Sequence, residues 1–497
     1  MNKKFLNFVI LFISFLLLYS ACAKKSSTTS DSTSNSDNQT TSSDEAPNQI
    51  VFSKSIMDPD ATQSKDYEES ASDVIKTSGG DYVVVGTSIS WEWPMPDNMD
   101  DILIVKLDGT SGNVIWNKKI HLRNFDRATS VVEDNDGNYV LTGFTSSNDT
   151  NKSDVFFGKV DPQGNVLTKK AIKITKNYDG GYSISKTADG GFIIAGWTFS
   201  FSNGDSDSWL IKTNSNGGEE WNKNFGGSNA DVGLSVNQLN DGGYIVTGYT
   251  ESYGNGGSDV WLIKTDSQGN EEWKNTFDSG YREYGTDIEI DADGGFIIAG
   301  YRIWDEYYYT IDDELFFIKT DSYGDTIWTS TFDIGYYEHV TNGVLTNDGS
   351  YIITGQTTFM ESGTNLIDSE VLLLKINSDG DSLWTKTFGG VESDKGYSVK
   401  QTSDNGYIIA GTTVSFGNGF LELYLIRTIP DIENATASIQ ELPSSFYLHN
   451  NYPNPFNPVT TLRYDLPEDA VVNITIYDMM GRVVSNLVSS QQNAGYK

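Results

Sequence analysis

Several features that would point to familiar chemistry are scarce or missing in this 497-residue chain. It has one cysteine, so no disulfide can form within the chain. Its three histidines, His121, His339 and His449, lie in separate segments without an HxH or HExxH spacing. No P-loop and no dinucleotide-binding glycine pattern is present. We therefore expect no recognisable catalytic constellation, no cofactor and no metal site.

Positive charge is also in short supply. The chain has 34 Lys and Arg against 68 Asp and Glu, which gives a formal net charge of -34. Such an acidic balance repels nucleic acid and anionic membrane surfaces, so neither is expected as a partner. No window over the central part of the sequence shows a sustained helical period, which argues against helices there.

One short phrase returns seven times at intervals of 52 to 57 residues. It consists of a turn ending in Gly, an aromatic residue, three mostly aliphatic or small residues, and a closing Gly. The closing residues are Gly86, Gly143, Gly196, Gly248, Gly300, Gly355 and Gly411. Strand-like content at this period predicts a repeat architecture, in which units must stack because none buries its apolar face alone.

Each repeat reads as four short strands separated by turns that contain Asp or Asn with Gly. In the third repeat the strands are expected at 182–187, 192–198, 208–213 and 219–225. A tryptophan recurs in the fourth strand, and we expect it to pack between neighbouring sheets rather than to bind a ligand. These residues are Trp116, Trp221, Trp273, Trp328 and Trp384, with Thr168 at this place in the second repeat.

The seventh repeat lacks its fourth strand, because the chain runs from 423–428 into Ile429 and Pro430. The segment IVFSKSI at 50–56 fits the missing strand, with Phe52 at the tryptophan position. A strand from the N-terminal side that completes the last sheet closes a ring and removes an open edge. We therefore predict an all-β fold, a seven-bladed β-propeller of four-stranded blades over residues 50–428.

The repeats loosely resemble the tryptophan-docking repeat of quinoprotein dehydrogenases and of outer-membrane assembly propeller lipoproteins. The resemblance rests on Asp108-x-x-Ser111-Gly112-x-x-x-Trp116, a spacing that only the first repeat keeps. It supports the propeller. The quinoprotein enzymes also use an adjacent cysteine pair beside the quinone, which one cysteine cannot supply, so no quinone cofactor is implied.

The N-terminus has the pattern of an export signal. Two lysines and an apolar run too short for a comfortable membrane span lie within residues 1–22. This resembles a bacterial lipoprotein signal, although Tyr19 stands where that family usually has Leu, and it implies lipidation of Cys22. Cleavage after Ala23 is the alternative. Residues 23–49, dominated by Ser, Thr, Asp and Asn, predict a disordered tether.

The C-terminus carries a second targeting signal, which follows a linker at 429–445. The segment NYPNPFNP at 451–458 and the pattern Tyr477-Asp478-x-x-Gly481-Arg482 closely resemble the type IX secretion C-terminal sorting domain of Bacteroidetes-type bacteria. The resemblance implies a small Ig-like sandwich over 446–497, recognised by the secretion machinery at the outer membrane. Because the chain stops before the last strands of that domain, we expect a truncated, partial sandwich.

The loops after the second strand of each repeat are long and variable, whereas the other turns are short and uniform. We expect these loops to emerge on one face and to build a binding surface there. Two of them mix aromatic rings with carboxylates, which suits a glycan or a protein ligand, although the rings could instead pack on their own blade. The candidate residues are Trp91, Trp93, Trp304, Asp305, Glu306 and Tyr308.

Two functions follow from this surface. The first is a non-enzymatic binding or adhesion module at the cell surface, attached to the membrane only through its lipid anchor, or secreted. The second is a glycan-cleaving hydrolase that uses carboxylates such as Glu92, or Asp305 with Glu306. Only the hydrolase needs two carboxyl groups that converge at roughly 5 to 10 Å. A scaffold role in outer-membrane assembly is a third possibility, which the sorting domain disfavours.

Overall fold

The computed structural model describes residues 5–11, 50–56, 66–91, 99–123, 125–146, 152–172, 177–202, 204–255, 257–303, 313–335, 337–360, 367–416, 420–429, 447–448, 464–466, 470–477, 483–492 and 495–496. These residues form strands and turns. Among them no helix is long and apolar enough to cross a membrane. The chain divides into two compact units, Ser42–Glu433 and Met1–Thr41 together with Asn434–Lys497.

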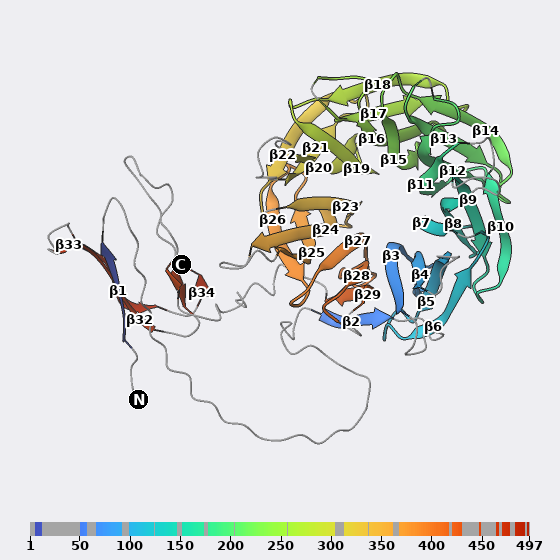
Figure 1. The fold of residues 1–497 in the computed structure, drawn as a ribbon. Coiled ribbons are helices and arrows are strands. Elements are labelled where there is room, and N and C mark those ends of the chain that lie inside the picture. Colours follow the sequence, from blue (N-terminus) through green and yellow to red (C-terminus); the bar gives the residue numbers. More distant parts are fainter. Residues whose placement is uncertain are drawn as a thin grey trace, which may run out of the picture. The chain divides into compact units, whose positions relative to one another are not determined.

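Seven antiparallel sheets of four strands, the blades, form the larger unit and stand in a ring (Figure 1). Blade 1 contains β3 (Asp66–Lys76), β4 (Tyr82–Trp91), β5 (Met99–Leu107) and β6 (Val114–Ile120); blade 2 contains β7 (Asp126–Glu133), β8 (Tyr139–Ser146), β9 (Ser153–Val160) and β10 (Val166–Ile172). Blade 3 contains β11 (Asp179–Lys186), β12 (Phe192–Thr198), β13 (Asp207–Thr213) and β14 (Glu219–Phe225); blade 4 contains β15 (Asp231–Gln238), β16 (Tyr244–Thr250), β17 (Asp259–Thr265) and β18 (Glu271–Phe277).

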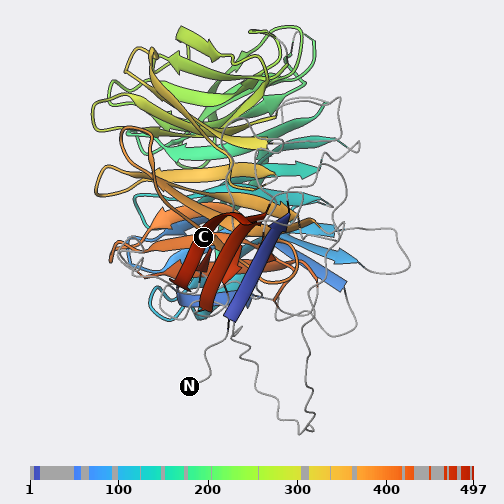
Figure 2. The same cartoon turned by 90° about the vertical axis from the view of Figure 1, so that its left-hand side faces the viewer.

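The other three blades complete the ring, which Figure 2 shows from the side. Blade 5 contains β19 (Arg282–Ile290), β20 (Phe296–Ile303), β21 (Asp313–Thr320) and β22 (Thr326–Phe332); blade 6 contains β23 (Glu338–Leu345), β24 (Tyr351–Met360), β25 (Ile367–Ile376) and β26 (Ser382–Phe388). Blade 7 contains β27 (Asp394–Gln401), β28 (Tyr407–Thr413), β29 (Glu422–Thr428) and β2 (Ile50–Ile56). The first strand of each blade lies nearest the centre of the ring (Figure 1).

The ring is closed by strand β2. It pairs antiparallel with β29, with Phe52 opposite Arg427 and Ile56 opposite Leu423. The sequence prediction of an all-β, seven-bladed propeller closed by its N-terminal strand is therefore confirmed. Because β2 is the outer strand of blade 7, residues from both ends of the repeat region share one sheet.

The apolar core lies between neighbouring blades. Each buried cluster combines residues of two adjacent sheets, so a blade is stable only against its neighbours. The fourth-strand tryptophans belong to these contacts, and each packs on the aromatic residue that begins the second strand of the next blade. Ring centroids are 5.7 to 6.3 Å apart in the pairs Trp116–Tyr139, Trp221–Tyr244, Trp273–Phe296 and Trp384–Tyr407. The predicted role between sheets is confirmed for these residues.

The two ends of each blade differ in their connections. The turns between the first and second strands, and between the third and fourth, lie at what we call the turn end. The connections between the second and third strands, and those between blades, lie at the opposite, loop end.

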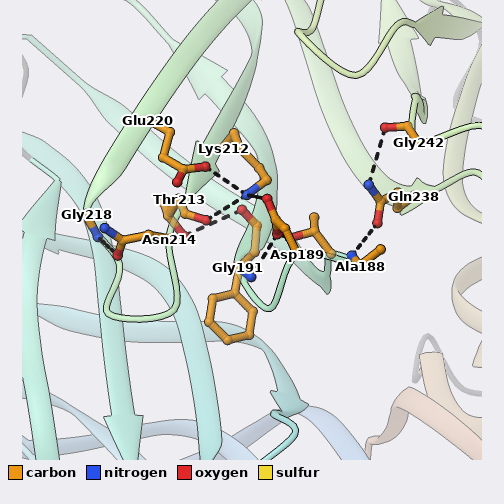
Figure 3. A network of polar contacts seen from close by, with 12 residues as sticks. Ala188, Asp189, Gly191, Lys212, Thr213, Asn214, Gly218, Glu220, Gln238 and Gly242 are labelled. Atoms are coloured by element: carbon orange, nitrogen blue, oxygen red, sulfur yellow. Dashed lines mark hydrogen bonds and ion pairs between the residues drawn. The ribbon is translucent and has the colours of Figure 1, made fainter.

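At the turn end, a Lys or Arg of the third strand pairs with an Asp of the preceding turn in every blade. The pairs are Lys106–Asp81, Lys159–Asp134, Lys212–Asp189, Lys264–Asp241, Lys319–Asp291, Lys375–Asp348 and Arg427–Asp404. Figure 3 shows the pair in blade 3, where Nζ of Lys212 lies 2.8 Å from Asp189 and 3.0 Å from Glu220. In every blade, therefore, one carboxylate of the turn end is paired with a positive charge.

Lys212→Met is expected to lower the unfolding free energy by about 1 kcal/mol at neutral pH, a small value because its acidic partners are half exposed and screened by water. Burial would raise the pKa of Asp189, but hydrogen bonds from Lys212 and Thr187 lower it to about 2. Since this pKa lies below that of the unfolded chain, the stabilisation is present above about pH 4 and is lost as the pH falls through about 2.

Denaturation midpoints of wild type and Lys212→Met, measured from about pH 6 to about pH 2, should therefore converge in acid. Lys223→Met is the control, because the Lys223 amine contacts the neutral amide of Asn270 at 3.1 Å. A difference between wild type and Lys212→Met that stays constant down to the lowest pH would contradict the assignment.

The smaller unit contains two three-stranded sheets. In one, β1 (Phe5–Leu11) pairs in parallel with β32 (Ala470–Tyr477), which pairs antiparallel with β33 (Val483–Gln492). The other consists of β30 (Tyr447–Leu448), β31 (Tyr464–Leu466) and β34 (Gly495–Tyr496). Cys22, the proposed lipidation site, lies outside the described residues.

Candidate functional site

The predicted ligand-binding residues belong to connections at the loop end of the ring. Most of them lie outside the described residues, namely Trp93, Trp304, Asp305, Glu306 and Tyr308, as does Glu92. Trp91 is the last residue of β4. The structure therefore describes the strand ends that flank these connections.

At the loop end, each blade has one acidic residue in its first strand and one in its third strand. Both are paired with the same residue of the second strand, which lies between them. In blade 4, Asp231 and Asp259 flank Thr250. The first-strand members are Glu69, Asp126, Asp179, Asp231, Glu283, Glu338 and Asp394. The third-strand members are Asp101, Asp154, Asp207, Asp259, Glu314, Glu370 and Glu422. The sequence reading missed these pairs, although an acidic residue does recur with the repeat.

The first-strand acids are buried, and hydrogen bonds tie most of them to the connections between blades, whereas Asp179 accepts from Thr198 and Ser200 of its own blade. Asp394 accepts hydrogen bonds from the Ser415 hydroxyl at 2.6 Å and from the Gly390 N–H at 2.8 Å. Burial raises the pKa of Asp394, although these hydrogen bonds act in the opposite direction. These hydrogen bonds hold the connection between two blades in place, so the role of the Asp394 carboxylate is structural.

Several third-strand acids meet a nitrogen donor. Arg123 lies 2.7 Å from Asp154, and Arg302 lies 2.7 Å from Glu314. Two more of these acids meet a donor without a permanent charge. The amide of Asn224 lies 2.7 Å from Asp207, and Nδ1 of His121 lies 2.8 Å from Asp101. Buried carboxylates are expected to have such partners, because desolvation of an unpaired charge is costly.

Four aromatic side chains form a continuous series of ring contacts at the loop end of blades 4 to 6, with one edge-to-face pair and two stacked pairs. The tyrosine stack consists of Tyr249 in β16, Tyr284 in β19, Tyr301 in β20 and His339 in β23, all half-buried. Ring centroids are 5.0 Å apart for Tyr249–Tyr284, 5.0 Å for Tyr284–Tyr301 and 4.2 Å for Tyr301–His339. Because β20 ends at Ile303, the stack adjoins the start of the connection that contains Trp304.

Tyr249 and Tyr301 of the tyrosine stack keep their hydroxyl protons over the ordinary pH range. Burial, with the neighbouring tyrosines, raises the pKa of Tyr301 and brings that of Tyr249 to about 12. Nε2 of His339 lies 2.6 Å from Asp313, and the hydroxyl of Tyr284 lies 3.2 Å from that of Ser258. Protonated hydroxyls on aromatic rings can donate hydrogen bonds beside an apolar surface, which suits a neutral polyhydroxylated or peptide ligand.

A second aromatic group lies at the loop end of blade 3. The ring centroids of Trp197 and Phe199 are 5.7 Å apart, and those of Tyr178 and Phe199 are 6.4 Å apart. Tyr178 and the nearby strand residue Tyr182 are 43% and 37% exposed, so water reaches both rings. Aromatic side chains thus occur at this end of blades 3, 4, 5 and 6.

A polar group near the ring axis joins three blades. The carboxylate of Asp287 in blade 5 accepts hydrogen bonds from the Ser235 hydroxyl of blade 4 at 3.1 Å and from the Gly343 N–H of blade 6 at 2.9 Å. Burial raises the pKa of Asp287, and it also raises that of Glu289, where the charge of Asp287 adds to the effect. Perturbed carboxyl groups can mark an active site, but the contacts of Asp287 show that it holds blades together.

Comparison with known protein families identifies the C-terminal segment. Residues 450–496 match the family model of the secretion system C-terminal sorting domain. No curated protein matches the chain. Similar solved structures include a protein of unknown function from Dyadobacter fermentans DSM 18053, 8% identical, with a TM-score of 0.42 over 77% of this chain and 98% of that one.

Two other similar structures are the β-propeller domain of the trilobed protease from Pyrococcus furiosus and a PL25 ulvan lyase. The first is 13% identical, with a TM-score of 0.41 over 72% of this chain and 93% of that one. The second is 11% identical, with a TM-score of 0.44 over 75% and 98%. Likeness of this degree carries no information about activity. The sorting domain, together with the closed ring, shows that the chain is an exported seven-bladed β-propeller with a type IX secretion sorting domain at its C-terminus.

Proposed function

We propose that this exported propeller is a non-enzymatic binding module whose loop end engages a glycan or a protein. The observation that carries the proposal is the concentration of half-buried aromatic side chains at the loop end of blades 3 to 6, beside the connection that contains Trp304. The turn end, in contrast, is closed by short turns and repeated ion pairs. Aromatic anchors with polar tips are the groups that dominate binding energy at such surfaces.

The proposal is tested by a glycan array with the full chain, followed by affinity measurements on any glycan that binds. Trp304→Ala and Trp93→Ala are expected to weaken binding by more than about tenfold, because an aromatic anchor contributes about 2 kcal/mol or more. Tyr323→Ala is the matched control, since Tyr323 is 76% exposed and lies at the turn end of blade 5. Equal affinity of all three variants would place the binding surface elsewhere.

The alternative is a glycan-cleaving hydrolase that uses the loop carboxylates. At the loop end, the described first-strand acids are buried, and most of those with described hydrogen bonds hold the connections between blades, which favours binding over catalysis. The two functions separate in the same array, because a hydrolase releases new reducing ends from a bound polysaccharide. If such release occurs and Glu306→Gln abolishes it while binding remains, the enzyme replaces the binding module.

We further propose that lipidation of Cys22 and the tether at 23–49 hold the propeller at the outer membrane. The sorting domain supports export to the cell surface or secretion, and the export machinery is accordingly a partner.

A further inference from the structure

The seam between blades 4 and 5 brings three carboxylates close together. Asp259 begins β17, Asp278 directly follows β18, and Glu283 lies in β19. One oxygen of each lies within 4.8 Å of the others. Asp278 occupies the place that His121 takes directly after β6, so this seam adds a third acid where the first seam has an imidazole.

Asp259 is deeply buried and has no donor among the described residues. Its relative exposure is 1%, and neither carboxylate oxygen accepts a hydrogen bond from a described residue. The connection before it closes tightly over the group, since a Cβ on Gly254 would lie 2.3 Å from Oδ2. Its equivalents Asp154 and Asp207 receive Arg123 and Asn224, respectively, so the missing donor is specific to this position.

Glu283 adds a second buried oxygen without a donor. Its Oε1 accepts hydrogen bonds from the Ser279 hydroxyl and the Tyr281 N–H, whereas Oε2 has no donor among the described residues. Asp278 is exposed, and the amide of Asn255 and the N–H of Gly280 orient it. Three oxygens, two of Asp259 and one of Glu283, therefore have no described donor, and the carboxylate of Asp278 lies beside them. An unneutralised carboxylate in such a place is costly.

We propose that Asp259, Asp278 and Glu283 bind one divalent cation, for which Ca²⁺ is the best fit. Calcium takes six to eight oxygen ligands at about 2.3 to 2.6 Å, so two ligands on opposite sides of it lie about 4.8 Å apart. Backbone carbonyls and water would complete the shell. The cation would link blade 4 to blade 5 next to Tyr284, and it would therefore order the base of the tyrosine stack. This site does not depend on the nature of the ligand at the loop end.

When no cation is bound, the three neighbouring carboxylates repel one another. The wild type should therefore be less stable in EDTA than in saturating Ca²⁺.

The test uses the full chain, calorimetric titration with Ca²⁺ alone, and thermal unfolding in EDTA and in Ca²⁺. Wild type is expected to bind one ion and to unfold at a higher temperature in Ca²⁺. Asp259→Asn should bind more than about tenfold more weakly. It should also be more stable than wild type in EDTA at neutral pH. Asp278→Asn, at an exposed position that leaves the core intact, should weaken binding as well. Asp207→Asn, the same position in blade 3, should leave binding unchanged.

Two outcomes would overturn the site. One is the absence of calorimetric binding and of any thermal shift at about 10 mM Ca²⁺, a concentration above the dissociation constants of weak extracellular calcium sites. The other is retention of wild-type affinity in Asp259→Asn and Asp278→Asn, which would place the ion elsewhere.

Discussion

Gly300→Ala is expected to lower the unfolding free energy by about 3 kcal/mol or more, the range of severe overpacking. Gly300 closes the repeated phrase of blade 5, and a Cβ there would lie 1.9 Å from the carbonyl oxygen of Tyr284 in the neighbouring strand. The obstacle is backbone, which cannot turn away as a flexible side chain can. The two strands would have to separate and lose ladder hydrogen bonds.

The control for this prediction is Gly294→Ala in the same blade. Gly294 has a φ of +79° and nothing within 4 Å of an added Cβ, so only the cost of the left-handed conformation applies. That cost is about 1 kcal/mol. Chemical denaturation of both variants measures the difference. If the two substitutions cost the same, close approach is not the reason for the glycine in the phrase.

The same close contact explains why the phrase was visible in the sequence. In all seven blades the closing glycine would place a Cβ 1.7 to 2.0 Å from a first-strand carbonyl oxygen. Each first strand bulges beside this glycine, as between Gly285 and Asp287 in blade 5, which brings the two backbones together. Because this steric requirement recurs in every blade, the glycine recurs in the sequence, and its seven copies were sufficient to predict the number of blades. The closure was predicted separately, from the fit of residues 50–56 to the missing fourth strand of the seventh repeat.

The candidate site was harder to predict from the sequence, because its residues come from three different blades. An aromatic residue directly follows the closing glycine in blades 2 to 5, as Phe144, Trp197, Tyr249 and Tyr301. That signal could have identified half of the aromatic surface. Tyr284 and His339 belong to first strands of different repeats, and only the ring geometry places them beside Tyr301.

The pairs of acidic residues could not be predicted from the sequence for a related reason. In the sequence, Asp231 and Asp259 are separated by a full strand and two connections, and nothing marks them as members of one end of a sheet. The register across Thr250 joins them. Their burial also could not be inferred, because a solvated acidic fringe is the ordinary expectation for a chain with net charge -34.

Ile56→Asp is expected to open the ring. Ile56 is 7% exposed and packs in the cluster that joins blades 7 and 1, opposite Leu423 of β29. A buried carboxylate there should cost about 3 kcal/mol or more. Strand β2 is held mainly by its pairing and packing against blade 7, because no described residue before β2 belongs to a blade. It should therefore detach, and the exposed edge of β29 should pair with other molecules.

Ile172→Asp is the matched control, because Ile172 ends the fourth strand of blade 2 and is also 7% exposed. Local destabilisation should be similar, but β10 is tethered within a continuous blade and cannot leave as a separate strand. Limited proteolysis with mass spectrometry should therefore find new cleavage within 50–56 only in Ile56→Asp, accompanied by oligomers on size exclusion. Equal protection of residues 50–56 in both variants would mean that closure contributes little, and that the contacts between blades alone hold the circle. Contacts across the same seam, which include apolar packing and the 2.7 Å hydrogen bond from the Ser398 hydroxyl to Asp73, would then keep the ring closed without β2.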